Sequence, residues 1–149
     1  MVPAEKEKRK RLGEILKSSA LITDQQLQKA LEFQKEEGGL IGEILIKLGF
    51  VGEIDIVQAL TMQYGFPYIP VENYELNQEM IKVIPETLAR EHGIVPIDVM
   101  GDILTIAMSN PLNDKAIEDV ETLTKKKVQV FIGTMTGISG ALNKLYKKS

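Results

Sequence analysis

The chain of 149 residues has no cysteine and a single histidine, His92. The absence of cysteine excludes a disulfide framework and a thiolate metal site. One histidine argues against a histidine-based metal centre and against a catalytic triad built around an imidazole. We therefore expect neither metal ligands nor a resident cofactor.

A long hydrophobic run is also missing. No apolar stretch approaches the roughly 18 residues that a membrane-spanning helix needs. The N-terminal segment, MVPAEKEKRKR, carries charges without the apolar stretch that follows them in a secretory signal. These two absences lead us to expect a cytoplasmic protein.

Excess positive charge is absent as well, because the net charge is −3. Binding to DNA or RNA depends on neutralising phosphates, so we expect neither as a partner. The basic residues at the N-terminus lie within residues 1–10, and Arg11 follows them. Such a run is typical of a solvated tail that leads into a helix, and we interpret all of it except Arg11 in this way.

Catalytic motifs are missing too. The segment Gly133–Gly137 is not followed by the Lys-Ser or Lys-Thr of a P-loop. The sequence contains neither a GxSxG nor an HExxH motif, and turn caps or solvated faces explain the carboxylates. We therefore expect that this chain is not an enzyme.

The most informative feature present is an internal repeat, since residues 11–34 and 40–63 align without a gap. The identical pairs are Gly13/Gly42, Glu14/Glu43, Ile15/Ile44, Leu16/Leu45, Ala30/Ala59, Leu31/Leu60 and Gln34/Gln63. Any repeated core would keep its apolar residues, but the repeated glycine and glutamine need a separate reason.

Each copy of the repeat predicts a helix–turn–helix of short amphipathic helices. The pattern Thr23-Asp24-Gln25-Gln26 is a capping box, so a helix should begin at about residue 24 and end at Gly38. The second copy predicts helices over about 40–48 and 53–64. Two copies are too few for a solenoid, which favours a compact four-helix subdomain.

The sequence pattern changes after residue 66 from repeated amphipathic helices to a mixture of helices and strands. We place the boundary between the two halves at residues 67–75. We expect a short edge strand at 68–71 and helices at 78–84, 86–91, 113–123 and 137–146. We also expect strands at 94–99, 103–108 and 128–132, the first two of which are joined by residues 100–102 as a hairpin. The prediction is an α+β fold with a basic tail (1–10), a helical subdomain (11–66) and a small α/β subdomain with three or four strands (67–149).

The ends of the repeated helices suggest a binding site. Arg11 and Gly13 are at the start of one helix, and Gln34 is at the end of the next. The guanidinium group of Arg11 can bind a phosphate, and Gly13 lets a ligand approach the backbone closely. The amide of Gln34 can bond to the edge of a base. A duplicated half-site suits a two-fold symmetric ligand. The alternative is structural: the glycines allow close helix packing, and the glutamines cap helices or face water.

At this point the sequence resembles a known family. The pattern RLGxxLxxxxLIxxxxLxxxLxxQ, repeated after a five-residue spacer, is similar to that of the MshEN domain, the N-terminal module of type II secretion and type IV pilus assembly ATPases. The second half also resembles that domain, in the segments Val95–Ile97, Gly101–Pro111 and Leu123-Thr124.

The resemblance implies a regulatory domain that binds cyclic di-GMP, a two-fold symmetric dinucleotide, with the ATPase activity in a separate domain. Carried over by position, the binding residues would be Arg11, Leu12, Gly13, Leu27, Leu31, Gln34, Ile41, Gly42, Ile56, Leu60, Gln63 and Asn110. The alternative is an adaptor that docks such an ATPase to its inner-membrane platform protein without binding nucleotide. Either function would place the protein at the inner membrane only through a partner.

This chain departs from the family pattern at two important positions. Leu40 replaces the arginine of the second copy, and Asn110 replaces an aspartate before proline. Losing one charge-assisted contact costs about 1.5–3 kcal/mol, or about one to two decades in affinity. Ala20 in place of glycine and Lys17 at an apolar position are milder changes. Messenger binding is therefore expected to depend largely on Arg11.

Overall fold

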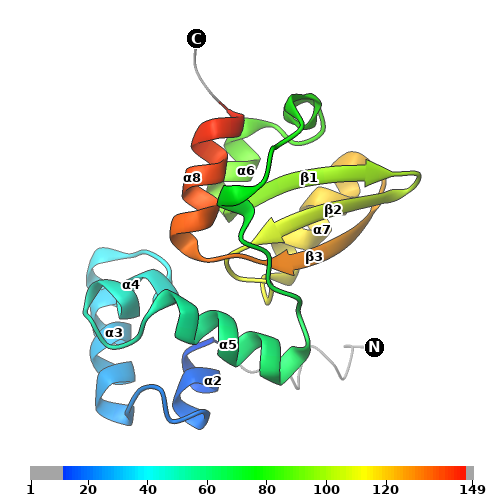
Figure 1. The fold of residues 1–149 in the computed structure, drawn as a ribbon. Helices are drawn as coiled ribbons and strands as arrows, with labels where there is room; N and C mark the ends of the chain where they lie inside the picture. Colours follow the sequence, from blue (N-terminus) through cyan, green and yellow to red (C-terminus); the bar gives the residue numbers. More distant parts are fainter. Residues whose placement is uncertain (1–11, 147–149) are drawn as a thin grey trace, which may run out of the picture. The chain divides into compact units, whose positions relative to one another are not determined.

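The computed structural model describes residues 12–146, and the chain divides into two units, residues 1–64 and 65–149. The first unit contains the helices α2 (Leu12–Ser18), α3 (Asp24–Glu37), α4 (Ile41–Lys47) and α5 (Glu53–Tyr64). The second contains a three-stranded sheet, three α-helices and two short 3-10 helices (Figure 1). The predicted α+β fold is confirmed.

The repeat is visible in the backbone hydrogen bonds of the first unit. At the end of α2, Leu21 N–H donates to Leu16 C=O and Ala20 N–H donates to Lys17 C=O. At the end of α4, Phe50 and Gly49 make the equivalent bonds to Leu45 and Ile46. This pair of bonds is the Schellman motif, so both copies turn from their first helix to their second in the same way.

The capping box at the start of α3 is present as predicted. Thr23 Oγ1 accepts from Gln26 N–H at 3.1 Å, and Gln26 Oε1 accepts from Thr23 N–H at 2.9 Å. The second copy keeps half of this arrangement, because Asp55 Oδ2 accepts from Gly52 N–H at 3.0 Å. Glycine at position 52 has no side chain to return the bond.

The sheet of the second unit has the strand order β1 (Ile94–Met100), β2 (Ile103–Met108) and β3 (Lys127–Ile132). Strands β1 and β2 form the predicted hairpin, and β2 and β3 are parallel with α7 (Asp114–Thr124) as the crossover. A bulge interrupts the hairpin register between Pro96 and Asp98. Pro96 is tolerated because β1 is an edge strand.

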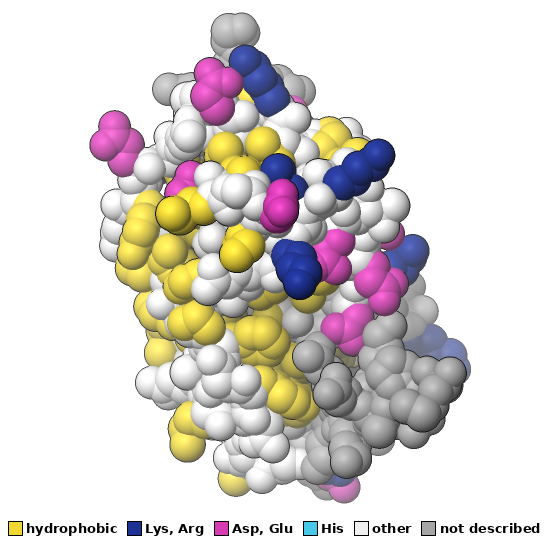
Figure 2. Space-filling model, turned by 90° about the vertical axis from the view of Figure 1, so that its right-hand side faces the viewer, with side chains coloured by type: hydrophobic (Ala, Val, Ile, Leu, Met, Phe, Trp, Pro, Cys, Tyr) yellow, Lys and Arg dark blue, Asp and Glu magenta, His cyan; other side chains and the backbone are white. Residues whose placement is uncertain are grey.

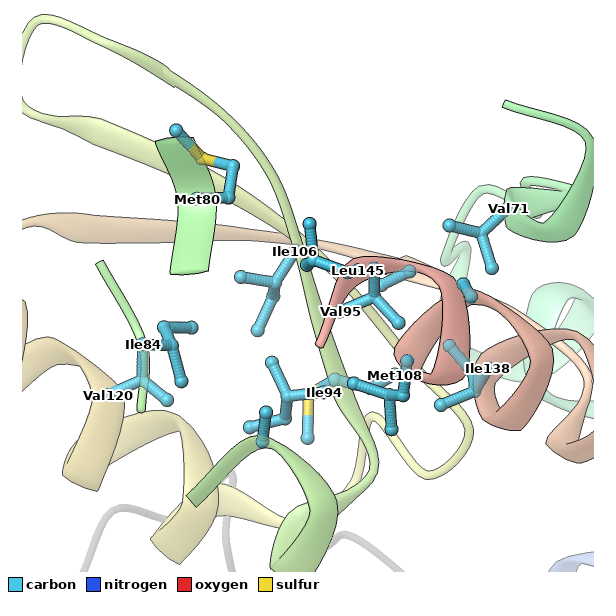
Figure 3. Close-up of a cluster of buried hydrophobic side chains, with 14 of the residues drawn as sticks. Val71, Met80, Ile84, Ile94, Val95, Ile106, Met108, Val120, Ile138 and Leu145 are labelled. Atoms are coloured by element: carbon cyan, nitrogen blue, oxygen red, sulfur yellow. The ribbon is translucent and has the colours of Figure 1, made fainter. Parts of the chain in front are cut away.

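The core of the second unit joins the sheet to the helices α6 (Glu86–His92), α7 and α8 (Met135–Leu145). Side chains from separate elements converge in it, among them Ile94 of β1, Val120 of α7 and Leu145 of α8 (Figure 3). Tyr146, directly after α8, donates a 2.6 Å hydrogen bond to the carbonyl oxygen of Ile84. This bond ties the end of α8 to the segment before α6.

At the entry to the second unit, one prediction is wrong and one helix is shorter than predicted. The expected edge strand at 68–71 is a single bridge between Tyr68 and Ile132, followed by the 3-10 helix η1 (Val71–Asn73). Pro70 has no N–H to extend the ladder and instead precedes η1. The expected helix at 78–84 is present as the 3-10 helix η2 (Gln78–Lys82). It ends before Ile84, because a residue that precedes proline is disfavoured in the α conformation.

Candidate functional site

A pocket of about 480 Å³ lies against the first copy of the repeat, between α2, α3 and the start of α4. Its volume falls within the range of about 300–1,000 Å³ that is usual for small-molecule sites. The residues that line it are Gly13, Glu14, Lys17, Ser18, Asp24, Leu27, Gln28, Leu31, Gln34 and Ile41. Five of them, Gly13, Leu27, Leu31, Gln34 and Ile41, are among the predicted binding residues.

Three of these five form an apolar floor. Leu27 and Leu31 are one turn apart on α3, and Ile41 opens α4. Leu27 is buried, whereas Leu31 is 39% exposed, a large fraction for a leucine in a helix that packs on its neighbours. An exposed leucine at the mouth of a pocket offers the kind of surface on which a flat ring can stack.

Close helix packing is one reason for glycine at position 13. A Cβ atom added to Gly13 would lie 2.6 Å from Cδ1 of Leu27. The structural alternative that the sequence left open therefore applies to this glycine. Gly13 and Leu27 both line the pocket, so a larger residue at position 13 would displace part of the pocket lining.

Gln34 has a definite partner at the end of α3. Its Nε2 donates to the carbonyl oxygen of Gly39 at 3.0 Å, which fixes the turn into α4. The side-chain oxygen is the group that such a bond leaves available for a ligand's N–H. Gln63, its counterpart in the second copy, is exposed near the end of α5.

Charged groups form one rim of the pocket. Lys17 Nζ lies 3.0 Å from Asp24 Oδ1, so this ion pair joins the end of α2 to the start of α3. Glu14 lies one turn before Lys17 on α2. Lys17 is the only cationic residue among the described residues that line the pocket.

The remaining predicted site residues lie elsewhere. Leu12, Gly42, Ile56 and Leu60 are buried, and the side chains of Ile56 and Leu60 are 3% and 0% exposed. These residues support the core of the first unit, and a ligand would reach them only if they were uncovered. The two copies thus differ sharply at the aligned pair, since Leu31 is exposed and Leu60 is not.

Of the two remaining predicted residues, the structure describes Asn110 and does not describe Arg11. Asn110 belongs to the second unit, where its Oδ1 accepts from Leu112 N–H at 3.2 Å in the turn before α7. The side-chain carbonyl therefore shapes this turn, a role that does not need the charge of aspartate. Arg11 lies outside the described residues.

A second pocket of about 480 Å³ surrounds the α3–α4 turn and includes Leu40. Leu40 precedes α4, is 50% exposed and provides no side-chain cap to that helix. Nearby, Lys47 Nζ lies 5.8 Å from the centre of the Phe33 ring. Leucine at position 40 thus presents an apolar group to solvent where the family pattern has arginine.

Sequence reasoning missed five residues that line the first pocket: Glu14, Lys17, Ser18, Asp24 and Gln28. Helical spacing is the signal that could have identified them. Asp24, Gln28 and Leu31 follow the i, i+4, i+7 spacing on α3, and Gly13 and Lys17 are one turn apart on α2. A motif built from identical positions overlooks Lys17, Ser18, Asp24 and Gln28 because they differ between the two copies, whereas Glu14 is identical in both copies and was not assigned to the site.

Two further features of the described part of the chain bear on function. Within residues 12–146, no group of three or more His, Asp or Glu side chains is arranged to hold a metal ion. No helix in the same range is long and apolar enough to cross a membrane.

Comparison with known proteins gives relatives that are type IV pilus assembly ATPases. The type IV pilus assembly ATPase PilB of Myxococcus xanthus is 35% identical over 136 residues, which are 91% of this chain and 24% of that protein. The PilB of Thermus thermophilus is 32% identical over 92% of this chain and 16% of that protein. The chain therefore spans a quarter or less of the length of these relatives.

Solved structures agree with the sequence relatives. A structure of MshE with cdg (cyclic di-GMP) superposes with a TM-score of 0.72 and 30% identity, over 93% of this chain and 100% of that one. The N-terminal domain of XpsE, at 18% identity, shares the fold with a TM-score of 0.69 over 90% of this chain and 92% of that one. The model of the MshEN domain matches residues 64–149, more than half of the chain. Together with the repeat in residues 11–63, these matches show that the chain belongs to the MshEN domain family.

Proposed function

We propose that the chain is a regulatory domain that binds cyclic di-GMP and belongs to a type IV pilus or type II secretion ATPase. The pocket at the first copy of the repeat carries this proposal, because it brings together Gly13, Leu27, Leu31, Gln34 and Ile41. The similarity to MshE, whose structure includes cdg, supports the choice of ligand. The match to a small part of the PilB ATPases supports the choice of motor.

The residues that line the pocket support this choice of ligand through their chemistry. The floor of Leu27, Leu31 and Ile41 suits the flat face of a purine. Guanine presents N–H donors beside its O6 and N7 acceptors, and the free Oε1 of Gln34 can accept one of these donors. Arg11, directly before α2, would bind a phosphate through its planar fork or stack on the base.

The test is an isothermal calorimetric titration of the full chain with cyclic di-GMP, with GMP as a half-ligand control. We expect binding by the wild type and a loss of about tenfold to hundredfold in affinity for Arg11→Ala, since a charge-assisted contact disappears. Lys29→Ala removes an exposed cation of α3 that does not line the pocket, and it should bind as the wild type does.

The possible outcomes test the identity of the ligand and the assignment of Arg11 to the site separately. No heat at high micromolar cyclic di-GMP would rule out the messenger. Binding that persists unchanged in Arg11→Ala would retain the messenger and exclude Arg11 from the site.

A second function, docking to a protein partner, is favoured by one surface of the second unit. At the β1–β2 turn, Met100 is 74% exposed and Ile103 46% exposed, and Leu123 at the end of α7 is 51% exposed. Lys125, Lys126 and Lys127 follow one residue later, after Thr124, and Lys126 Nζ donates to the carbonyl oxygen of Gly101 at 3.2 Å. We name these six residues, 100, 103, 123 and 125–127, the hairpin-end surface.

The hairpin-end surface fits an acidic amphipathic segment of a partner protein. Its exposed apolar side chains require an apolar partner face, and its lysines require negative charge beside that face. Figure 2 looks onto the side at which the hairpin projects and shows hydrophobic side chains interspersed with lysines and acidic groups. Because Asp98 and Asp102 are exposed at the same end of the sheet, a discrete acidic segment fits better than a continuous anionic membrane.

A further inference from the structure

We infer that Lys17 is a phosphate-binding residue of the pocket. The inference rests on the proposed binding of cyclic di-GMP and concerns a residue at which this chain departs from the family pattern. Its basis is the geometry of the pocket rim, where Lys17, Asp24 and Glu14 meet.

The first step is the charge of the rim. The described lining includes two carboxylates, Glu14 and Asp24, and one cation, Lys17. Cyclic di-GMP carries two negative phosphodiester groups, so the carboxylates would repel it. Among the described lining residues, Lys17 alone can offset that repulsion.

The second step is the availability of the Lys17 ammonium group. Its ion pair with Asp24 is short, at 3.0 Å, but both side chains are well exposed, with exposed fractions of 43% and 75%. Ion pairs at such exposure contribute little to stability, because solvent screens them. A phosphate that enters the pocket can therefore replace Asp24 as the partner of Lys17 at little cost.

The third step is reach and placement. Lys17 lies one turn after Gly13 on α2, and both residues line the pocket. A lysine side chain has a flexible four-carbon stem and three donors, so its ammonium group can leave Asp24 and follow a phosphate without a backbone change. The aligned residue of the second copy is Ile46, which cannot do this. The inference therefore also predicts that the two halves of the ligand are held by different contacts.

The experiment compares calorimetric titrations with cyclic di-GMP for the wild type, Lys17→Met, Lys17→Arg and Asp24→Asn. Lys17→Met keeps a stem of similar length without the charge, and its affinity should fall by about tenfold or more. Lys17→Arg should restore most of the affinity. Asp24→Asn should bind several-fold more tightly than the wild type, because it removes both the competing partner and a repelling charge.

Lys29→Met is the matched control, since Lys29 lies exposed on α3 outside the pocket lining, and it should leave affinity unchanged. A merely structural role of the Lys17–Asp24 pair predicts the opposite pattern for Asp24→Asn, namely weaker binding with a lower melting temperature. Wild-type binding that Lys17→Met does not weaken would overturn this inference and leave the proposed function standing. Absence of binding by the wild type would overturn the proposed function, and this inference with it.

Discussion

Ala20 and Gly49 occupy the same position in the two copies of the repeat and the same left-handed backbone region, with φ values of 61° and 79°. Each residue ends the turn after the first helix of its copy through equivalent hydrogen bonds. Glycine adopts this region without strain, whereas an L-residue with a Cβ incurs about 1–2 kcal/mol. The structure thus explains why a glycine is expected at position 20 and shows that alanine there is strained.

This comparison predicts that Ala20→Gly stabilises the chain and that Gly49→Ala destabilises it. The relief of strain exceeds the extra entropy that glycine loses on folding, so each effect should be about 0.5–1 kcal/mol. Position 49 is a clean test because a Cβ added there would meet nothing within 4 Å. Urea denaturation of both variants measures the free energies of unfolding. If the two variants shift stability in the same direction, the strain argument does not hold.

Gly13 illustrates a residue whose role the sequence alone could not decide. Its identity with Gly42 predicted either close ligand approach or close helix packing, and the sequence could not separate them. The contact between position 13 and Leu27 shows the packing reason, and it depends on how two helices meet in space. The same limit applies to the pair Leu31 and Leu60, which are identical in sequence but differ in exposure.

At the scale of elements, local signals predicted helices and strands well. The capping box placed the start of α3 at residue 24, and alternating apolar residues around Gly101 predicted the hairpin of β1 and β2. The differences lie next to prolines. The predicted edge strand at 68–71 is only a bridge, because Pro70 has no N–H to extend the ladder. The predicted helix at 78–84 ends at Lys82, before the residue that precedes Pro85.

The C-terminal end of α8 shows how one buried group fixes an element in place. Tyr146 is 8% exposed, and its hydroxyl donates to the carbonyl oxygen of Ile84 at 2.6 Å. Burial, and then the negative charge of Glu86, raise the pKa of Tyr146 from 10.0 to about 12. The folded state therefore favours the neutral phenol more strongly than the unfolded state does.

A pH dependence with a definite sign follows from this pKa. Because the folded pKa is the higher one, the contribution of Tyr146 to stability is fully present below pH 10 and is lost as the pH rises toward 12. Tyr146→Phe should cost about 1–3 kcal/mol at neutral pH, since it leaves a buried carbonyl unpaired. The difference between the two proteins should shrink above pH 10. Urea titrations at pH 7 and pH 11 test this, and a gap that stays constant would show that the phenol does not titrate as described.

At the scale of the whole molecule, the two units carry different kinds of surface. The first unit has a pocket with an apolar floor and a rim that carries Glu14, Asp24 and Lys17. The second has its own core and the hairpin-end surface, which suits an acidic protein segment. The match to the MshEN model covers the second unit, whereas the doubled motif lies in the first. The function proposed above requires both properties, namely a site that binds the ligand and a surface that binds a partner.

This division predicts that binding of ligand and binding of partner can be removed separately. Lys125→Glu together with Lys127→Glu reverses two exposed charges of the hairpin-end surface and should abolish co-purification with the cytoplasmic part of the platform protein of the same pilus or secretion system. The same variant should retain wild-type affinity for cyclic di-GMP, because neither lysine lines the pocket.

Two controls make this prediction specific to the surface. Lys82→Glu with Lys115→Glu introduces the same charge change on exposed lysines elsewhere in the second unit, and it should leave co-purification intact. Arg11→Ala should show the reverse pattern of the hairpin-end variant, with ligand affinity lost and co-purification retained in the absence of ligand. Loss of co-purification in both double variants would point to net charge as the cause. Retention in both would remove the hairpin-end surface from consideration as the docking site and leave the proposed ligand site unaffected.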